Sequence, residues 1–553
     1  MPMNRREALT VMSAMPTLPR LPAESGQALI EKHDQSLASM LERQVTEASS
    51  NWRGAYPNAV GIHQPGSAAR LIEFGAAAYL HAQSKYHQDK SLVQRIDWAV
   101  QFLRRMQSTD GNIDLLTTNF NSPPDTGFVV EHVARAAQLA RLYEDQSLEQ
   151  LIRPFLLKAA QGLTRGGIHT PNHRWVVSAA LAQVHQLYPN EKYLQRIDEW
   201  LAEGIDIDEE GQFIERSTAI YNAVCDNALL TMALKLERPD LIEPVRQNLD
   251  AMLYLLHPNF EVVTEISRRQ DINTQATMQR YWFPLRYLAI HDQNGQYAAL
   301  VRQIEPHARS LPLMMEYEEL TKPLPPNQAI PTDYQKHYAL AEITRIRRGP
   351  LSATIMHKGN HRWFCLRWGN AVINAVRFAS AFFGKGQFVP ERFEQRDGVF
   401  HFQQTLRGPY YQPIQDESLL PITRSNWGER RQQRQQTEIC EMHYQASIQE
   451  TRMGFQLQIQ ATGTPNVPLA VEINLRQDGE LESVLPAPQA QAAYLFENQT
   501  VTYRRQGDAI RIGPGIKEHA YTQLRGADNK LPGPSLYLTA YTPFDHIITF
   551  ECI

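Results

Sequence analysis

Apolar residues recur at intervals of three and four through the first half of the chain. From about residue 27 to residue 307 they form one stripe after another, the spacing typical of amphipathic helices. Short segments rich in Gly, Pro, Asn and Asp separate the stripes. The pattern predicts about ten or more helices, paired and stacked around a ring. The expected helices include residues 176–187, 193–201, 219–236, 241–255 and 281–290.

The periodicity changes to two in the C-terminal part of the chain. A proline-rich segment, Lys-Pro-Leu-Pro-Pro at 322–326, comes before the change and has the composition of a linker. Alternating runs separated by Gly and Pro turns then predict an antiparallel β-sandwich. These runs are 352–357, 362–367, 455–460, 469–474, 509–513 and 546–550.

The fold class predicted from these two patterns is a multidomain α+β protein. An N-terminal (α/α) toroid of paired helices is followed by an antiparallel β-sandwich. The expected boundaries are a tail or weak export signal over 1–25, a toroid catalytic domain over 26–320, a linker over 321–339 and a sandwich over 340–553. A length of 553 residues is too great for one hydrophobic core, which agrees with this division.

The composition limits the classes of molecule that the protein is expected to bind. The net charge is -4, and a nucleic-acid-binding protein usually carries a basic excess that is absent here. An acidic polysaccharide would have to be held by a local basic cleft. The four cysteines show no C-x-x-C spacing, which excludes a disulfide scaffold and a zinc ribbon and favours free thiols over a Cys365–Cys440 bridge.

The N-terminus bears on localisation. Arg5 and Arg6 precede a short, weak apolar stretch that resembles a degraded twin-arginine export signal. This favours a periplasmic or secreted protein, and the alternative is a plain tail on a cytoplasmic one. No run reaches the roughly 18–20 apolar residues of a membrane span, so no membrane partner is expected.

The segment from His169 to Trp175 reads His-Thr-Pro-Asn-His-Arg-Trp. It opens an expected helix, where free backbone N–H groups and the helix dipole favour an anion. Asn172 and Arg174 can hold an acid, His173 can move a proton, and Trp175 offers a flat surface to a sugar ring. The same residues also fit a structural role, with Asn172 as an N-cap and His173 and Trp175 in the core.

A second polar group follows an Asp-Glu-Glu-Gly turn and leads into another apolar helix. It contains Glu215, Arg216 and Tyr221. A tyrosine has an ordinary pKa near 10 and needs a nearby cation to act as a base. Arg216 or Arg174 could supply that cation, although a solvated Glu215–Arg216 pair beside a core tyrosine fits equally well. The two groups together give the candidate catalytic residues Asn172, His173, Glu215 and Tyr221.

Further candidates for substrate binding lie outside these two segments. Arg268 and Arg269 suit bidentate recognition of a carboxylate or sulfate, or form a surface charge cluster. Trp282 could line the same cleft. His357 could reach the cleft as a general acid or base, although an ordinary strand histidine is the commoner case. Asp125 fits either a helix cap or a substrate-binding carboxylate.

The Asn172-His173-Arg174-Trp175 segment, with the Gly-centred turn, the Glu, the Arg and the Tyr that follow, resembles the toroid polysaccharide lyases. These include alginate lyases and the heparinase II/III-like enzymes. The resemblance implies β-elimination from a uronic-acid glycan without a cofactor. It also implies that Asn172 neutralises the carboxylate, His173 aids proton transfer, and Tyr221 is the base or acid. The chain departs from the pattern in having Pro171 where the group has a second Asn.

Two other functions stay open. The layout is also similar to toroid exo-glucuronidases, whose hydrolysis would need two carboxylates, such as Glu215 with Asp125, Asp206 or Asp208. A non-catalytic glycan-binding protein is the third hypothesis. A metal site at His169 and His173 is disfavoured, because Pro171 lies between them and no companion ligand stands at helical spacing. Such toroid proteins often form homodimers, which makes a homodimer a candidate assembly.

Overall fold

The computed structural model describes residues 23–305 and 311–553. The expected tail and export signal therefore lie almost wholly outside the described residues. The chain forms two compact units. The first comprises the residues up to Met252, Ser267–Asp271 and Thr277–Ile330, and the second comprises Leu253–Ile266, Ile272–Ala276 and Pro331–Ile553. Each unit is thus built from more than one stretch of sequence.

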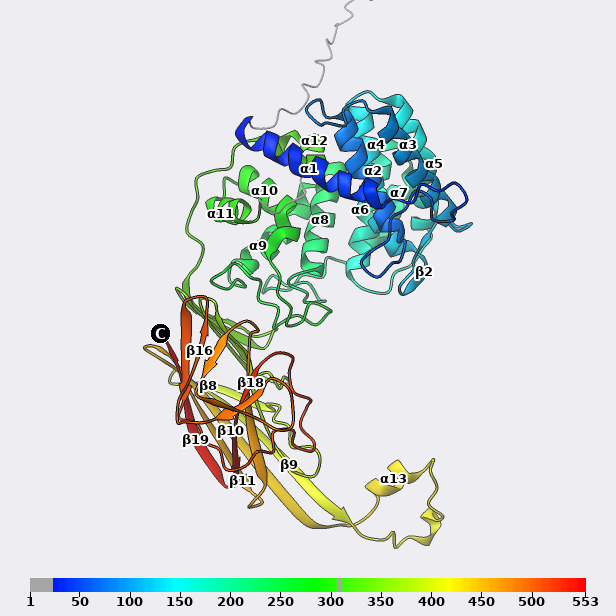
Figure 1. Cartoon of the computed structure of the whole chain (residues 1–553). Coiled ribbons are helices and arrows are strands. Elements are labelled where there is room, and N and C mark those ends of the chain that lie inside the picture. The colour runs from blue at the N-terminus through cyan, green and yellow to red at the C-terminus, as the bar shows by residue number, and fades with distance from the viewer. Residues whose placement is uncertain (1–22, 306–310) are drawn as a thin grey trace, which may run out of the picture. The chain divides into compact units, whose positions relative to one another are not determined.

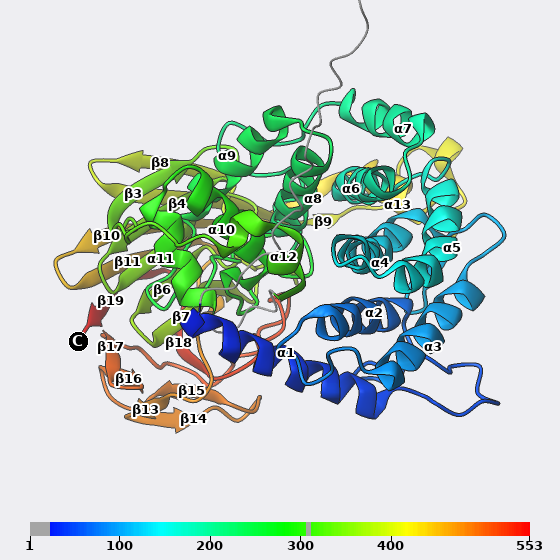
Figure 2. The same ribbon diagram turned by 90° about the horizontal axis from the view of Figure 1, so that it is seen from above.

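The first unit is helical, as the spacing of three and four predicts. Helices α2, α4, α6 and α8 pack side by side in one row, and α3, α5, α7 and α9 each pack against a member of that row (Figure 2). The helices are α1 (Ala23–Arg43), α2 (Pro65–Leu80), α3 (Lys90–Met106), α4 (Pro123–Leu142), α5 (Gln146–Leu163), α6 (Asn172–Leu187), α7 (Glu191–Leu201), α8 (Tyr221–Lys235), α9 (Ile242–Met252), α10 (Trp282–His291), α11 (Gly295–Ile304) and α12 (Leu311–Glu316). Single 3-10 turns are η1 (Pro239–Leu241), η2 (Met278–Tyr281) and η4 (Glu318–Thr321).

Burial separates the inner row from the outer helices. Helix α6 is buried almost continuously over its first thirteen residues, whereas α7 buries only Tyr193 and Ile197. A helix that is apolar on all sides must be surrounded by other elements, and an amphipathic helix covers the outside. Because inner and outer helices alternate along the chain as antiparallel neighbours, the inner helices run in the same direction. Their N-termini therefore gather at one end of the unit.

Most inner helices also differ from the outer helices in how their first backbone N–H groups are bound. The outer helices α3, α5 and α7 begin at Asp89, Asp145 and Asn190, whose side chains accept hydrogen bonds from backbone N–H groups. The inner helices α2, α6 and α8 begin without a side-chain cap, and α6 is entered through Pro171, whereas the inner helix α4 is capped by Ser122. The N-termini of α2, α6 and α8 consequently leave backbone donors for partners from elsewhere in the chain.

A buried charge network ties inner helices to α12. Arg135 of α4 forms ion pairs with Glu73 of α2 and with Glu316 of α12, and Lys235 of α8 reaches the same Glu316 at 2.6 Å. Burial raises the pKa of Glu73, but His132 and Arg135 outweigh it and hold that pKa at about 2. The carboxylate stays charged, and each member of the network has its opposite charge in contact.

The second unit is a sandwich of two sheets. The nine-stranded sheet has the order β14-β15-β18-β12-β7-β6-β5-β4-β3, and the eight-stranded sheet has the order β13-β16-β17-β19-β11-β10-β9-β8. Neighbours pair antiparallel, as predicted, except for the parallel pair β15 and β18. The strands of the nine-stranded sheet are β3 (Asp333–Tyr338), β4 (Ile343–Arg348), β5 (Leu351–Met356), β6 (Phe364–Trp368), β7 (Ala371–Ser380), β12 (Pro468–Leu475), β14 (Val484–Pro486), β15 (Ala493–Phe496) and β18 (Ser535–Tyr541). Those of the eight-stranded sheet are β8 (Arg392–Arg396), β9 (Val399–Tyr411), β10 (Gln436–Thr451), β11 (Gly454–Gly463), β13 (Glu480–Glu482), β16 (Val501–Arg505), β17 (Asp508–Gly513) and β19 (Phe544–Cys552).

The boundary between the two units differs from the linker that was expected over residues 321–339. Strand β3 starts at Asp333, inside the segment expected to be a linker, and pairs with β4 over its whole length. Two segments from the helical half of the sequence, 253–266 and 272–276, pack with the sandwich. Their sequences lack strand alternation, so the period-two pattern does not reveal that they belong there.

Alternation along the strands defines two faces of the nine-stranded sheet. Leu366, Ile373 and Ile473 point into the core shared with the other sheet. Arg367 of β6, and Arg476 directly after the end of β12, point to the opposite face, and this face is also buried. A charged outer layer therefore lies beneath the covering segments of the second unit.

A two-stranded arm extends from the sandwich. The last residues of β9 and the first of β10 pair only with each other, and between them lie η5 (Glu417–Leu419) and α13 (Trp427–Gln432) (Figure 1). Another short hairpin, β1 (Ile113–Leu115) with β2 (Asn119–Ser122), belongs to the helical unit. None of the four cysteines, all within the described range, forms a disulfide. Among the helices of residues 23–305 and 311–553, none is both long and apolar enough to cross a membrane.

Candidate active site

The N-terminus of α6 is capped by a carboxylate from a distant loop. Oε1 of Glu215 accepts hydrogen bonds from the backbone N–H of Asn172 at 3.0 Å and from its Nδ2 at 2.6 Å. Both residues are buried. A negative charge at a helix N-terminus is favourable because unpaired N–H groups and the helix dipole are positive there. The two sequence groups that together give the candidate catalytic residues are therefore in direct contact.

The amide of Asn172 is oriented by these contacts. Nδ2 donates to Glu215 and also to Oγ1 of Thr170 at 3.1 Å. Oδ1 is buried and has no hydrogen-bond partner among the described residues. The group that this side chain can offer a ligand is thus an acceptor, suited to a sugar hydroxyl or a protonated acid.

A buried aspartate fastens the loop of Tyr221 to the 267–271 loop. Asp271 accepts hydrogen bonds from Oγ of Ser217 at 2.9 Å, from the backbone of Ala219 at 3.0 Å and from Oγ of Ser267 at 2.8 Å. Oγ of Ser217 in turn accepts the backbone N–H of Tyr221 at 3.0 Å. Sequence reasoning missed Asp271 and Ser217, although the Ser-x-x-x-Asp spacing of 267–271 is a local turn signal.

This junction places two polar side chains against Tyr221. Nε2 of Gln270 donates to the phenolic oxygen at 3.1 Å. The guanidinium of Arg269 lies over the tyrosine ring, 5.0 Å from its centre, and 3.5 Å from Oε2 of Glu215. The phenol of Tyr221 therefore has one hydrogen-bond donor and one cation as neighbours. The sequence placed Arg269 in a substrate-binding loop but gave no sign of Gln270.

His173 completes the group from the side of α6. It is buried, its ring meets that of His169 edge-on at 4.8 Å, and Phe128 of α4 lies edge-on at 6.4 Å. Burial, followed by the repulsion of His169, lowers the pKa of His173 to about 4. The imidazole is therefore neutral at pH 7 and can accept a proton but has none to spare as an acid.

Three predicted substrate-binding residues have structural positions instead. Trp175 is fully buried, and its Nε1 donates to Asp206 at 2.9 Å. Arg174 is buried against the same Asp206 at 2.9 Å and stacks on Trp175 at 4.4 Å. Trp282 is 3% exposed within α10. These side chains pack inside the helical unit because inner helices are covered on every side, and a sugar cannot reach them.

The remaining predicted residues lie in three different parts of the structure. Arg268 is exposed and its backbone N–H donates to the carbonyl of Arg216 at 2.8 Å, so both belong to the loop junction. Asp125 accepts hydrogen bonds from Ser122 and Asn119 near the start of α4. His357 lies in the second unit, where Nε2 shares a hydrogen bond with Thr344 at 2.9 Å and the ring stacks on Phe393 at 3.9 Å. Burial lowers the pKa of His357 to about 3.

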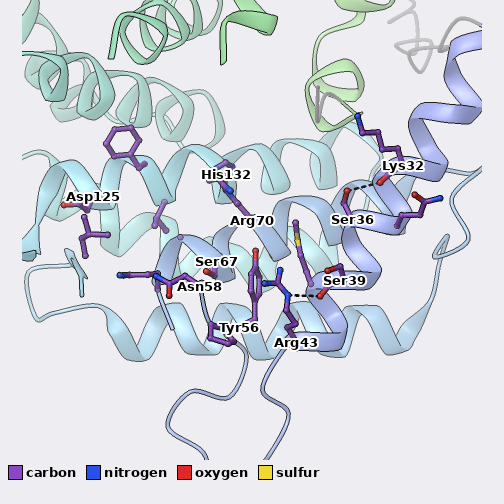
Figure 3. A pocket seen from close by; sticks show the side chains of 18 residues that line it. Lys32, Ser36, Ser39, Arg43, Tyr56, Asn58, Ser67, Arg70, Asp125 and His132 are labelled. Atoms are coloured by element: carbon purple, nitrogen blue, oxygen red, sulfur yellow. Dashed lines mark hydrogen bonds between the residues drawn. The ribbon is translucent and has the colours of Figure 1, made fainter. Parts of the chain in front are cut away.

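A cavity of about 870 Å³ opens between α1, α2 and α4 (Figure 3). Asp125 and Phe128 form one end of its wall, and Lys32, Arg43 and Arg70 supply positive charge. Arg70 is exposed and makes no hydrogen bond or ion pair with any described residue. A second hollow of about 280 Å³, lined by α4, α6 and α8, shares Arg70 and Phe128 with the first. The second hollow is lined by residues of α6 and α8, the helices that carry His173 and Tyr221, whereas the larger cavity is lined by residues of α1, α2 and α4.

Tyr56 and His132 also line the larger cavity and were not singled out in the sequence. Arg43 lies over the ring of Tyr56 at 4.8 Å, and both face the open space (Figure 3). His132 shares a hydrogen bond with the buried Glu73 at 2.7 Å. Neither residue stands in a motif, and only the three-dimensional arrangement brings them to the wall.

Solved structures with a similar arrangement identify the fold. A heparinase III matches over 95% of this chain and 84% of its own, at 7% identity and a TM-score of 0.52. The chondroitin AC lyase of Streptomyces coelicolor A3, in complex with chondroitin sulphate, matches over 96% and 80%, at 12% identity and a TM-score of 0.56. A Paenibacillus xanthan lyase matches over 97% of this chain and 57% of its own, at 9% identity and a TM-score of 0.57. The chain has the (α/α) toroid and β-sandwich fold of polysaccharide lyases. No family model and no curated protein matches the sequence.

The predicted fold is thereby confirmed, including its likeness to the toroid lyases. Identities of 7 to 12% are too low to carry residue roles from one chain to another. The chemistry of this toroid lyase-like protein has to be argued from its own side chains.

Proposed function

We propose that the protein is a polysaccharide lyase that cleaves a uronate-containing glycan by β-elimination. The observation that carries the proposal is a series of contacts in a toroid lyase fold: Gln270 binds the Tyr221 hydroxyl, and Arg269 links the Tyr221 ring to the Asn172–Glu215 pair. Elimination from a sugar requires a carboxyl group next to the carbon that loses its proton. A uronate supplies that group.

The roles follow from what each side chain can still offer. Arg269, half-buried between Glu215 and Tyr221, is positioned to pair with the uronate carboxylate and to make the C5 proton more acidic. Asn172 contributes its unpaired Oδ1, which is an acceptor, to a sugar hydroxyl. Glu215 is a positioning residue, since its charge holds the Asn172 amide and Arg269.

Proton transfer falls to Tyr221. Its hydroxyl oxygen, contacted by Gln270 and with Arg269 over the ring, acts in its deprotonated form and takes the C5 proton, and the electron pair of the C5–H bond forms the C4–C5 double bond. The bond from C4 to the glycosidic oxygen breaks, and the leaving oxygen takes up the proton that Tyr221 now carries. Neutral His173 is the second base available at this end of the unit.

The glycan itself is proposed to occupy the larger cavity. Its volume of about 870 Å³ suits several sugar rings, and the charges of Lys32, Arg43 and Arg70 suit a polyanion. Hydrolysis finds less support, because Glu215 is buried in contacts with Asn172 and Arg269 and so is not free to protonate a leaving group.

Product analysis tests the proposal. The enzyme is incubated with a panel of uronate glycans, and the ultraviolet absorbance of the 4,5-unsaturated product is followed with mass detection. Tyr221→Phe should lower the rate by roughly 10²–10⁴, the usual contribution of a general base. Tyr143→Phe removes a hydroxyl that makes no hydrogen bond within the described chain and should leave the rate unchanged. Saturated uronic acid as the product would overturn the proposal in favour of hydrolysis.

A further inference from the structure

The charged outer layer of the second unit contains a cavity of about 370 Å³. Its floor is formed by Arg367 of β6, Asn374 of β7 and Asn474 of β12, with Arg476 directly after β12. Its walls come from 264–265 and 272–275, the two stretches that flank the 267–271 loop in sequence, and from Arg362. All of these residues belong to one unit.

Two of the cavity's arginines already have carboxylate partners. Glu261 binds Arg476 in a bidentate pair at 2.8 and 2.9 Å and also contacts Arg367. Glu265 lies 3.7 Å from Arg367 and 3.3 Å from the buried His257. Burial raises the pKa of Glu265, but the surrounding positive groups outweigh it and hold the carboxyl charged. These pairs make the floor rigid and leave it close to neutral.

Arg362 differs from Arg367 and Arg476 in its lack of a carboxylate partner among the described residues. Its guanidinium is half-buried at the cavity and makes no hydrogen bond or ion pair with any residue of 23–305 or 311–553. The nearest carboxylates that act on it, Glu472 and Asp528, are paired with Arg377 at 2.6 Å and with His361 at 2.8 Å. Burial is the main cause that lowers the pKa of Arg362, which shows a cation partly removed from water without a counter-ion.

Neutral donors and acceptors surround this cation. The side chains of Asn273, Gln275 and Gln477 line the cavity, are exposed, and form no hydrogen bond with the described part of the chain. Three free amides beside one free guanidinium match a ligand with one acid group and several hydroxyls. The volume of about 370 Å³ is within the range of small-molecule sites and would hold a single sugar ring with room to spare.

We propose that this cavity binds a monoanionic sugar, with its acid group on Arg362 and its hydroxyls on the free amides. The site is separate from the Tyr221 cluster and does not depend on the proposed lyase activity. A fork of guanidinium N–H groups pairs with a carboxylate or a sulfate ester alike, so the shared chemistry is an acidic monosaccharide. Because the binding energy comes mainly from one charged contact, a millimolar affinity is expected.

Titration of the whole protein with D-glucuronate, glucose 6-sulfate and glucose tests the site. All titrations use the Tyr221→Phe background so that no turnover occurs. Both acids should bind, and glucose should bind at least tenfold more weakly. Arg362→Gln should weaken the binding of the acids at least tenfold. Binding of only one of the two acids assigns the site to carboxylates or to sulfates, and either result supports it.

A matched control separates this site from general electrostatics. Arg452, in the same unit, is exposed and lies outside the cavity, and Arg452→Gln removes the same charge. It should leave the affinity unchanged. Crystals of the wild-type protein soaked in D-glucuronate provide a second readout, with the carboxylate expected within hydrogen-bond distance of Arg362. Equal affinity in Arg362→Gln, equal binding of glucose, or a soaked cavity without sugar would each overturn the proposal.

Discussion

Glu261 offers a sharp test of the charged layer in the second unit. This residue lies in the 253–266 segment and binds two buried arginines, Arg367 and Arg476, on the outer face of the nine-stranded sheet. Replacing it with Gln keeps the shape and removes the charge. Both arginines then lose their carboxylate partner while they remain buried, and an uncompensated buried charge is strongly unfavourable.

The size of the effect can be worked out from the contacts. Burial raises the pKa of Glu261, yet Arg476 and Arg367 bring it from the ordinary 4.5 down to about 2. At about 1.36 kcal/mol for each tenfold change, this corresponds to roughly 3 kcal/mol. The carboxylate is 14% exposed, and allowing for solvent screening leaves about 2–3 kcal/mol. Since the folded pKa lies below the unfolded one, the contribution is present above pH 4.5 and is lost as the pH falls through about 2.

Hydrogen exchange followed by mass spectrometry measures the loss in the unit where it occurs. Peptides from β6 and β12 should exchange roughly 30- to 160-fold faster in Glu261→Gln at pH 7, the equivalent of about 2–3 kcal/mol. Glu450→Gln is the matched control, because Glu450 pairs with Arg348 in the same bidentate geometry, at 2.9 and 3.0 Å, but in a more exposed position. It should cost less than about 1 kcal/mol. Equal exchange rates in the two variants would refute the reasoning.

Three further variants probe the helical unit. Arg70→Gln should raise KM for a polyanionic glycan about three- to tenfold at unchanged kcat, and this difference should shrink in high salt. An unchanged KM would show that Arg70 does not contact the glycan. Asp226→Asn should raise the urea midpoint at pH 7, because burial raises the pKa of this carboxyl, which has no hydrogen-bond partner among the described residues, well above its usual range. The gain should vanish below about pH 4, where the carboxyl of the unfolded chain is protonated too. Asp206→Asn should lower stability by about 1–3 kcal/mol, because the buried Arg174 keeps only the more exposed Glu203 as a carboxylate partner and the Trp175 contact weakens, and a KM defect without a stability loss would contradict this structural role.

The fold was largely predictable because its two periodicities are long and clean. The runs at 176–187 and 219–236 fall on α6 and α8, and those at 469–474 and 546–550 fall on β12 and β19. Membership of the second unit was not predictable for 253–266. Charge pairing with Arg367 and Arg476, far along the chain, attaches this segment to the sandwich, and such pairing leaves no periodic signal.

The candidate site was predictable in outline only. Asn172, Glu215, Tyr221 and Arg269 were all named from the sequence, and the structure brings them together. Burial could not be predicted for Trp175, because a Trp one turn inside a helix can face a cleft or a neighbouring helix. The packing of α6 between α4 and α8 decides the matter. Whether these residues perform elimination stays a prediction.

Each unit is built from separate stretches of the chain, and this limits which parts of the gene can be removed or exchanged. A gene fragment that starts near residue 331 encodes most of the sandwich but omits Glu261 and Glu265, the carboxylate partners of Arg367 and Arg476. During synthesis, residues 253–276 leave the ribosome before any of those strands exist. The sandwich can therefore be completed only onto a segment already made. Recombination that exchanged sandwiches at the proline-rich junction would separate matched charges, so the two units are expected to be inherited as one block.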